Sequence, residues 1–336
     1  MKFLQALVTA VPDLKQYADG ADYCDWRNFV QCVKGVATKV KLTGLKLTQA
    51  SSLPDLADGV NGTLVTVTGF EANDIGAMLS GTLPLSWGRL TQMQRIVLSG
   101  NALTGSLPAE WSGMTSLMWV YVDGNSLTGE LPKSWSSFSL MMAVYAASNR
   151  LTGVLPSEWS GMTMLGTLAL SNNKLSGTLP AAWSSLRTLS WLELNNNSLS
   201  GPLPAEWSKL HMSKGNLLLQ DNNFCGCVPP EWAGSLTPTV DPAVSADSCA
   251  TTNVCVTASS SGAGPHSSSH SKPTPSPASS SHSSPSPSPA SSSHTSPRRL
   301  SQAAAVPTSP RALWCTAWSV KRATAQSAAS ARAGTR

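Results

Sequence analysis

The hydrophobic positions of this chain recur with a strict period through its central part. Each copy opens with Leu-Pro and has a Trp four residues after the Leu, which places tryptophans 24 residues apart at Trp87, Trp111, Trp135, Trp159, Trp183 and Trp207. A seventh copy, Val228-Pro229 with Trp232, arrives one residue late. A fixed period in this range predicts a solenoid in which each copy is one coil. The function of a solenoid usually lies on an extended face rather than in a pocket.

Within each copy, apolar residues alternate with variable ones over a short stretch. The fifth copy, LPAAWSSLRTLSWLELNNNSLSG, has Leu186, Leu189, Leu192, Leu194, Asn197, Leu199 and Gly201 in the pattern L-x-x-L-x-x-L-x-L-x-x-N-x-L-x-G. This pattern is that of the leucine-rich repeat, in which x-x-L-x-L is a short parallel strand. We therefore predict an α/β repeat fold, a leucine-rich repeat solenoid with a short parallel β-sheet on its concave face.

Three further repeat positions have structural interpretations. The asparagines Asn101, Asn125, Asn149, Asn173, Asn197 and Asn222 are expected to bond the backbone of the neighbouring coil, which satisfies groups that burial would leave unpaired. The glycine after each permits a tight bend. The tryptophans are expected in the core on the convex side, where each coil buries about six apolar side chains at roughly 1.5–3 kcal/mol apiece.

The segments around the array divide the chain further. We expect an N-terminal cap with degenerate repeats over residues 1–80, regular repeats over 81–226 and a cysteine-containing C-terminal cap over 227–257. The apolar residues of the first eleven positions fall on one helical face, which Pro12 ends, so a short amphipathic helix packed on the cap is expected. Degenerate strands are expected at Val40 to Leu42 and Leu64 to Val67.

Cysteines cluster at both ends of the array, at Cys24, Cys32, Cys225, Cys227, Cys249 and Cys255, and Cys315 stands apart in the tail. Even-numbered clusters of this kind predict disulfide-locked caps formed in an oxidising compartment. The alternative is a zinc site made by the last four clustered cysteines, but Cys-x-Cys followed by Cys-x5-Cys is poor zinc spacing. We therefore expect no metal, and a protein that is secreted or displayed at the cell surface.

Composition changes sharply after the C-terminal cap. Residues 258–297 form a Ser/Pro-rich tract that cannot bury a core and is expected to be a disordered stalk. Residues 298–336 form a basic tail without the features of an anchor signal. Residues 1–247 hold 15 basic and 18 acidic residues, a net charge of −3. Because the array has no basic stripe, nucleic acid is not an expected partner.

Catalytic chemistry is not indicated. His211 is the one histidine before the Ser/Pro-rich tract, and it has no evident nucleophile partner in the sequence. No phosphate-cradling glycine loop and no metal motif occurs. The sequence therefore predicts no enzyme, no catalytic residue and no cofactor.

The candidate binding residues are the variable ones that the strands should hold outward on the concave face. They are Arg95, Trp119, Tyr121, Asp123, Tyr145, Trp191 and Glu193. Trp119, Tyr121 and Tyr145 should cluster on adjacent strands, and exposed Trp and Tyr are enriched in protein-binding hot spots. The alternative is that these aromatic side chains merely cover the pleated sheet. Two glycosylation sequons begin at Asn61 and Asn196, the first in a plausible exposed loop.

Several long phrases carry a resemblance to a known family. LPAEWSGMTSLMWVYVDGNSLTGELP, LPSEWSGMTMLGTLALSNNKLSG and NNFCGCVPPEW closely resemble the repeats and C-terminal cap of the promastigote surface antigens of leishmanial parasites. The Ser-Pro tract resembles that of the related proteophosphoglycans. The resemblance implies a surface glycoprotein, often held by a glycolipid (GPI) anchor, that attaches to host cells or resists complement. The expected partner is then a host cell-surface or complement protein, with peripheral or anchored membrane association.

Two other functions remain open at the level of sequence. The protein could be a structural, stalked glycoprotein of the surface coat, in which glycans rather than the repeat face do the work. Alternatively, it could be a plant-type repeat inhibitor or receptor ectodomain, because the Gly-x-Leu-Pro form of the repeat is shared with those proteins.

Overall fold

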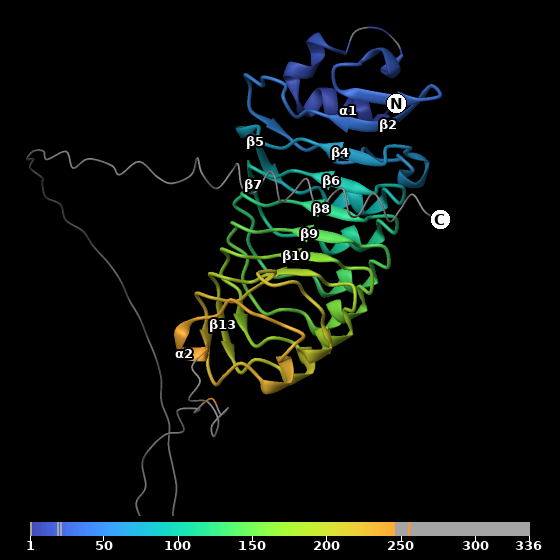
Figure 1. Ribbon diagram of the computed structural model, residues 1–336. Helices are drawn as coiled ribbons and strands as arrows, with labels where there is room; N and C mark the ends of the chain where they lie inside the picture. Colours follow the sequence, from blue (N-terminus) through green and yellow to red (C-terminus); the bar gives the residue numbers. More distant parts are fainter. Residues whose placement is uncertain (1, 19, 21, 246–254, 256–336) are drawn as a thin grey trace, which may run out of the picture. The chain divides into compact units, whose positions relative to one another are not determined.

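The strands and 3-10 helices stack in chain order into one solenoid (Figure 1). The computed structural model describes residues 2–18, 20, 22–245 and 255. The Ser/Pro-rich tract, the basic tail, Cys249 and Cys315 therefore lie outside the described residues. The result is the leucine-rich repeat solenoid that the 24-residue period predicts.

A nine-stranded sheet forms one face of the solenoid, called here the sheet face. Its order is β1-β2-β4-β6-β8-β9-β10-β12-β14, with β1 antiparallel to β2 and the others parallel. Each regular strand is only three residues long, because one coil offers one short extended stretch. The strands are β1 Val30–Val33, β2 Val36–Lys41, β4 Gly69–Glu71, β6 Arg95–Val97, β8 Trp119–Tyr121, β9 Ala143–Tyr145, β10 Thr167–Ala169, β12 Trp191–Glu193 and β14 Leu217–Leu218.

Two smaller parallel sheets form where the chain leaves the sheet face. One contains β3, β5 and β7 and the other β11, β13 and β15. Their bounds are β3 Ser51–Ser52, β5 Gly76–Thr82, β7 Asn101–Thr104, β11 Ser176–Gly177, β13 Ser198–Gly201 and β15 Asn223–Phe224. The glycine that ends this stretch takes a left-handed conformation, with φ of 76° at both Gly105 and Gly129, which a residue without Cβ adopts at no steric cost.

Short 3-10 helices form the side of each coil opposite the sheet. The regular ones are η4 Leu85–Arg89, η5 Ala109–Gly113, η6 Lys133–Ser137, η7 Ser157–Gly161, η8 Ala181–Ser185 and η9 Ala205–Lys209. The remaining helices are α1 Lys2–Ala10, η1 Pro12–Gln16, η2 Tyr23–Asp25, η3 Gly62–Leu64, η10 Pro230–Trp232 and α2 Pro242–Ser245. A proline stands at the N-cap of each regular 3-10 helix, where its fixed φ suits the turn.

Each regular 3-10 helix contains one repeat tryptophan, and the side chains of these tryptophans form a buried column, as expected. Trp111 and Trp135 have parallel rings with centroids 6.3 Å apart, and both are fully buried. Each indole Nε1 also donates a hydrogen bond to a proline carbonyl of the preceding coil, as Trp135 does to Pro108 O at 2.8 Å. The same bond joins each of the seven repeat tryptophans, from Trp87 to Trp232, to a proline, so the column is held by both stacking and hydrogen bonds.

The repeat asparagines form a second column, and the prediction that they bond neighbouring coils is confirmed. Asn125 Nδ2 donates to Leu98 O of the preceding coil at 2.9 Å and to Val122 O of its own coil at 3.0 Å. Its Oδ1 accepts from Leu103 N at 3.1 Å. One amide thus bonds backbone groups of two coils, and each of the two carbonyls also accepts from the asparagine of a neighbouring copy, Asn101 for Leu98 O and Asn149 for Val122 O.

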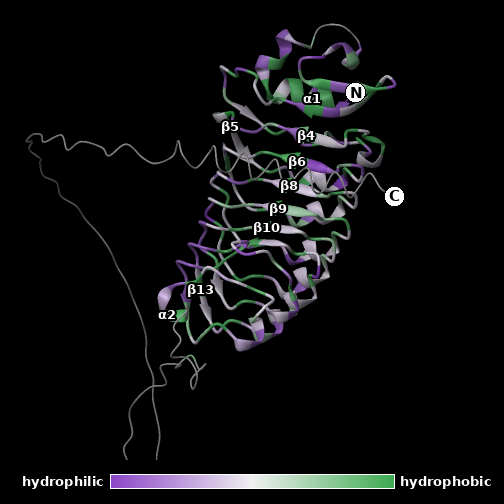
Figure 2. Ribbon diagram, viewed as in Figure 1, coloured by the Kyte–Doolittle hydropathy of each residue, from purple (hydrophilic) through white to green (hydrophobic). Residues whose placement is uncertain are grey.

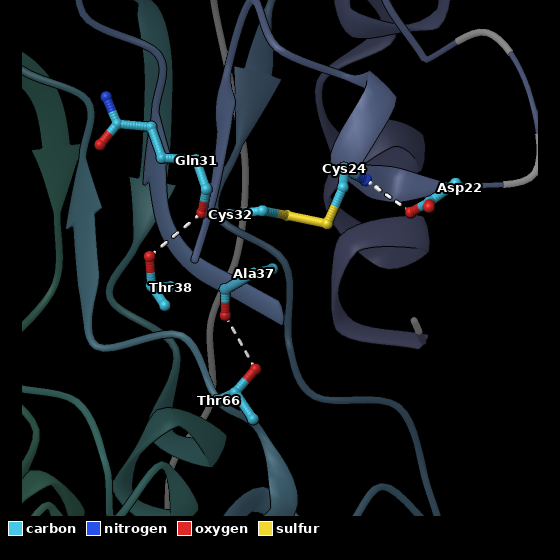
Figure 3. The surroundings of a disulfide bond; sticks show 7 residues. All are labelled: Asp22, Cys24, Gln31, Cys32, Ala37, Thr38 and Thr66. Atoms are coloured by element: carbon cyan, nitrogen blue, oxygen red, sulfur yellow. Dashed lines mark hydrogen bonds between the residues drawn. A yellow bond between two sulfur atoms is a disulfide. The ribbon is translucent and has the colours of Figure 1, made fainter. Parts of the chain in front are cut away.

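The N-terminal cap covers the open end of the first coils. Helix α1 buries Phe3, Leu4 and Leu7 and is drawn in the hydrophobic colour in Figure 2. Phe3 packs edge-on against Trp87, with ring centroids 6.2 Å apart. A disulfide joins Cys24 in η2 to Cys32 in β1 (Figure 3). The amphipathic helix and this cap disulfide are therefore confirmed.

The C-terminal cap closes the other end. Cys225 is bonded to Cys255, which excludes the alternative of a zinc site shared by the last four clustered cysteines. Cys227 is also disulfide-bonded. The solenoid then extends one step past β14, because Leu218 and Thr239 form an isolated parallel bridge.

One expected strand is wrong. The strand expected at Leu64 to Val67 lies instead at β4, where Phe70 pairs with Val40 and Ile96 in register. Phe70 is fully buried, whereas Leu64 is 74% exposed and ends η3. The apolar residues before β4 suggest a strand, but pairing with the neighbouring strands β2 and β6 decides which residues form it. Phe70 occupies the core-facing position of that strand.

Candidate binding surface on the sheet face

Parallel register arranges the outward residues of the sheet face into two rows. The first row contains Lys39, Gly69, Arg95, Trp119, Ala143, Thr167 and Trp191. The second row contains Lys41, Glu71, Val97, Tyr121, Tyr145, Ala169, Glu193 and Leu218. The three aromatic residues expected to cluster do lie together, on β8 and β9, near the middle of the sheet.

A continuous chain of contacts crosses four strands of this face. Glu71 binds Arg95, with Oε1 3.3 Å from Nε. The Arg95 guanidinium lies over the Tyr121 ring, 4.8 Å from its centroid, and Tyr121 stacks on Tyr145 at 4.8 Å. A guanidinium over an aromatic face is attracted by the ring quadrupole. The carboxylate, the cation and the two rings therefore hold one another in place before any partner binds.

The stack changes the role of Tyr121. We expected its side chain to be solvent-facing, but it is only 2% exposed, because Arg95 covers one side of the ring and Tyr145 the other. Arg95, Trp119 and Tyr145 remain partly exposed. Tyr121 is thus suited to support the surface, whereas Trp119 and Tyr145 are suited to touch a partner.

The two acidic residues expected on this face are also buried, each beside a hydroxyl. Asp123 Oδ1 accepts from Ser99 Oγ at 2.7 Å. Glu193 accepts from Trp191 Nε1 at 2.7 Å and from Ser171 Oγ at 3.5 Å. Asp123 and Glu193 are both 8% exposed, so the expectation of exposed carboxylates is wrong. Their hydrogen bonds fix neighbouring side chains, and Glu193 in particular orients the Trp191 indole.

Two partly exposed tryptophans stand apart in the first row, with small side chains between them. Trp119 on β8 and Trp191 on β12 are separated by Ala143 and Thr167. Three strand spacings of about 4.8 Å put the two tryptophan positions about 14 Å apart. A partner can therefore contact two large apolar side chains that are separated by a stretch of small ones.

The sequence predicted the positions of these residues but missed the contacts that fix them. The register given by the Leu-Pro-Trp repeats places each residue on its strand. The diagonal reach of Arg95 to both Glu71 and Tyr121 has no sequence signal, because it depends on a side-chain conformation. The tryptophan-to-proline bonds could have been inferred, since a proline precedes each repeat tryptophan from Trp111 to Trp207 by 27 residues.

The described residues hold no group of three or more His, Cys, Asp or Glu side chains placed to bind a metal ion. Within the same part of the chain, no helix is long and apolar enough to cross a membrane. Two open hollows lie on the N-terminal cap, away from the aromatic cluster.

The two sequons differ in their surroundings. Asn61 is exposed, and its Oδ1 accepts from Thr63 N at 3.1 Å and Thr63 Oγ1 at 2.8 Å, which leaves Nδ2 outside this turn. Asn196 is exposed too, but its Nδ2 donates to Asn172 Oδ1 at 2.8 Å. A glycan on Asn196 would be attached to the same nitrogen that makes this bond, whereas Asn61 Nδ2 makes no such contact among the described residues, so Asn61 is the better predicted site of the two.

The comparisons with known proteins agree with this architecture. A family model described as a leucine rich repeat matches residues 141–199. The fold is a leucine-rich repeat solenoid. The chain is 33% identical to the surface membrane glycoprotein GP46/M-2 of Leishmania amazonensis over 100 residues. This match covers 29% of the chain and 20% of that protein.

Solved structures of other proteins are similar in fold, a plant peptide hormone receptor among them. The peptide hormone receptor RGFR1, solved in complex with RGF2, has a TM-score of 0.51 and 26% identity, covering 58% of this chain and 32% of the receptor. PEPR1, solved with AtPEP1, has a TM-score of 0.57 and 24% identity, covering 68% and 35%. The matched part of this chain thus spans about a third of each of these two chains.

Proposed function

We propose that this protein binds a protein partner through the sheet face, at the cell surface or after secretion. The observation that carries the proposal is the set of partly exposed aromatic side chains on the sheet face, Trp119, Tyr145 and Trp191. Tyr145 stacks on Tyr121, which Arg95 covers, and the Trp191 indole donates to Glu193. Large aromatic side chains held rigidly lose little conformational entropy when a partner binds. Such side chains dominate the energetics of protein interfaces.

The similar proteins support this proposal in different ways. The GP46/M-2 match is to a surface membrane glycoprotein, and RGFR1 was solved bound to RGF2. The cap disulfides are typical of proteins that mature in an oxidising compartment. The finer proposal is a parasite protein whose partner is a host cell-surface or complement protein, so that it serves attachment or complement evasion.

The test begins with capture of the partner on the immobilised full-length protein, from host-cell surface proteins and purified complement components. Each captured protein is then titrated against the Trp119→Ala and Trp191→Ala variants by surface plasmon resonance. Loss of a central aromatic anchor costs about 2 kcal/mol or more, so each variant should bind at least tenfold more weakly.

Matched controls come from apolar residues exposed away from the sheet face. Leu85 is 56% exposed in η4 and Leu140 is 41% exposed. Leu85→Ala and Leu140→Ala should bind as the wild type does. Equal affinity in all four variants would refute the sheet face as the binding surface.

The coat-glycoprotein alternative makes the opposite prediction. If glycans on the Ser/Pro-rich tract act alone, deletion of residues 258–297 abolishes attachment and the tryptophan variants leave it unchanged. Retained attachment by the deletion variant, together with loss in Trp119→Ala, supports the sheet face.

A further inference from the structure

Exposed apolar side chains gather on the N-terminal cap. Val33 is 58% exposed, Val36 is 38% exposed and Leu64 is 74% exposed. Val33 and Val36 face each other across the turn that joins β1 to β2, at the N-terminal end of the solenoid (Figure 1). Leu64 and Val36 line the same hollow. A gathering of apolar side chains that the protein leaves in water calls for an apolar partner surface.

The turn between β1 and β2 presents a lysine at its tip. Lys34 has φ of 52° and Gly35 has φ of 75°, which is the pattern of a two-residue hairpin turn with both central residues left-handed. Asn, Asp and Gly adopt this conformation readily, whereas a long side chain does so at a cost. Lys34 takes the first of these two left-handed positions, between the exposed Val33 and Val36.

Two hollows flank this turn, and cations line both. One, of about 680 Å³, includes Arg27, Lys39 and Val33 in its walls. The other, of about 570 Å³, includes Lys2, Val36 and Leu64, and most of its wall is apolar. Among the described residues, neither hollow has an Asp or Glu in its lining.

These cations are available to a partner. Arg27, Lys34 and Lys39 are exposed, and none of them forms an ion pair with a carboxylate of the described residues. This contrasts with Arg95, whose charge is taken up by Glu71. The cap therefore combines exposed apolar side chains with three exposed cations that form no ion pair among the described residues.

The base of the hairpin is rigid. The Cys24–Cys32 disulfide ties β1 to η2, and Cys24 N donates to Asp22 Oδ1 at 2.8 Å (Figure 3). Thr38 Oγ1 donates to Gln31 O across the two strands at 3.2 Å. The tip is thus held at a fixed position, which lowers the entropy lost when it meets another surface.

We propose that the N-terminal cap is a peripheral docking surface for an anionic lipid bilayer. Val33, Val36 and Leu64 enter the boundary between headgroups and acyl chains, while Arg27, Lys34 and Lys39 lie against the headgroups. Shallow apolar insertion together with basic side chains is the combination by which proteins bind lipid surfaces without crossing them. A protein partner would have to match separate apolar and acidic patches, whereas an anionic bilayer supplies both chemistries over the whole surface.

Co-sedimentation of the full-length protein with phospholipid vesicles tests the proposal. Binding is expected with vesicles of phosphatidylcholine containing 30% phosphatidylserine, and it should weaken at least tenfold with phosphatidylcholine alone or at high salt. The Val33→Thr/Val36→Thr/Leu64→Gln variant should bind at least tenfold more weakly. Lys34→Asn should weaken binding several-fold, because Asn keeps the left-handed turn but removes the charge.

Matched controls separate this surface from general stickiness. Val154 and Leu85 are 52% and 56% exposed elsewhere on the solenoid, so Val154→Thr/Leu85→Gln should bind as the wild type does. Near- and far-ultraviolet circular dichroism checks that each variant is folded. Binding that survives the cap substitutions but is lost on removing residues 298–336 would assign it to the basic tail and overturn the proposal. Competition by soluble glycerophosphoserine at equal headgroup concentration would indicate a headgroup pocket instead, and would also overturn it.

Discussion

The interior of the array and its two ends satisfy their backbone groups with different chemistry. Inside, an asparagine amide both donates to carbonyls and accepts from an N–H, as Asn125 does. At the ends, carboxylates take over the accepting role. Asp13 accepts from Thr48 N and Gln49 N at 2.8 and 3.0 Å, and Asp241 accepts from Asp221 N at 3.0 Å.

The difference follows from what each coil has as a neighbour. An interior coil lies between two others, so its polar side chain must serve carbonyls and N–H groups together, and an amide can do both. At an end, the N–H groups of the last coil still need acceptors, and an ionised carboxylate supplies only acceptors. The backbone groups of the interior are therefore served by neutral amides, whereas those at each end are served by a carboxylate.

The largest expected effect comes from breaking the interior column at its centre. Trp135→Ala removes an indole stacked between Trp111 and Trp159 and its bond to Pro108 O. Truncation of a buried tryptophan to alanine lowers the free energy of unfolding by about 3–5 kcal/mol. Thermal unfolding followed by circular dichroism should show a large drop in Tm. Trp135→Phe keeps a ring but loses the hydrogen bond, so its Tm should lie between those of Trp135→Ala and wild type; equal Tm values for Phe and Ala would mean that stacking contributes little.

A smaller effect is expected from the asparagine column. Asn149→Ala removes the acceptor of Leu127 N and one of the two asparagine donors to Val122 O and to Ala146 O, which keep the donors Asn125 and Asn173. Leaving the Leu127 N–H without its acceptor costs about 1–3 kcal/mol, reduced where water can enter. Urea unfolding measures the loss. Asn149→Asp is the sharper variant, because it can still accept from Leu127 N but cannot donate. A Asn149→Asp variant as stable as wild type at neutral pH would contradict the need for a donor inside the array.

The third prediction is that acid destabilises the N-terminal end of the array. The hydrogen bond from the Thr48 side chain, with those from the Gln49 and Thr48 backbone, holds the pKa of Asp13 below its ordinary value. A carboxyl whose pKa is lower in the folded state contributes stability that is complete above its unfolded pKa of about 3.9, and that is lost as pH falls through the folded value. Stability should therefore fall below about pH 4, and hydrogen exchange should show residues 11–50 opening first.

The control for the acid experiment is Asp13→Asn, which cannot ionise. Its N-terminal region should be less protected than wild type at pH 6, and the difference should shrink as the pH is lowered. If the two proteins differ equally at both pH values, ionisation of Asp13 is not the cause.

The smallest effect is expected at an exposed ion pair on the outer side of the coils. Lys133 Nζ lies 3.1 Å from Glu158 Oε1, and both side chains are largely in water. The pKa of Glu158 is lowered first by a backbone hydrogen bond and only second by Lys133. Lys133→Gln should therefore leave both the Tm and the acid profile within experimental error. A clear loss would show that the exposed surface of the coils contributes to stability as the buried columns do.

The sequence predicted most of the interior and little of the ends. The 24-residue period places every repeat tryptophan and asparagine, because each coil repeats the same contacts. Residues 22–80 do not repeat, so the position of β4 depended on packing against β2 and β6 and could not be read from the run Leu64 to Val67. The accuracy of prediction for the sheet face lies between that for the interior and that for the ends. Its residues were placed correctly, but the burial of Tyr121, Asp123 and Glu193 arises from side-chain contacts that no pattern specifies.

The bond from each tryptophan to the preceding coil bears on how such a gene can change in length. Trp135 reaches Pro108, and Trp111 reaches Pro84 in the same way. If one whole 24-residue unit were deleted, Trp135 would meet Pro84 in the geometry that Trp111 has now. After gain or loss of one unit, the new contact between neighbouring coils has the same tryptophan-to-proline bond as the other contacts. Unequal recombination can therefore lengthen or shorten the array while both caps remain intact.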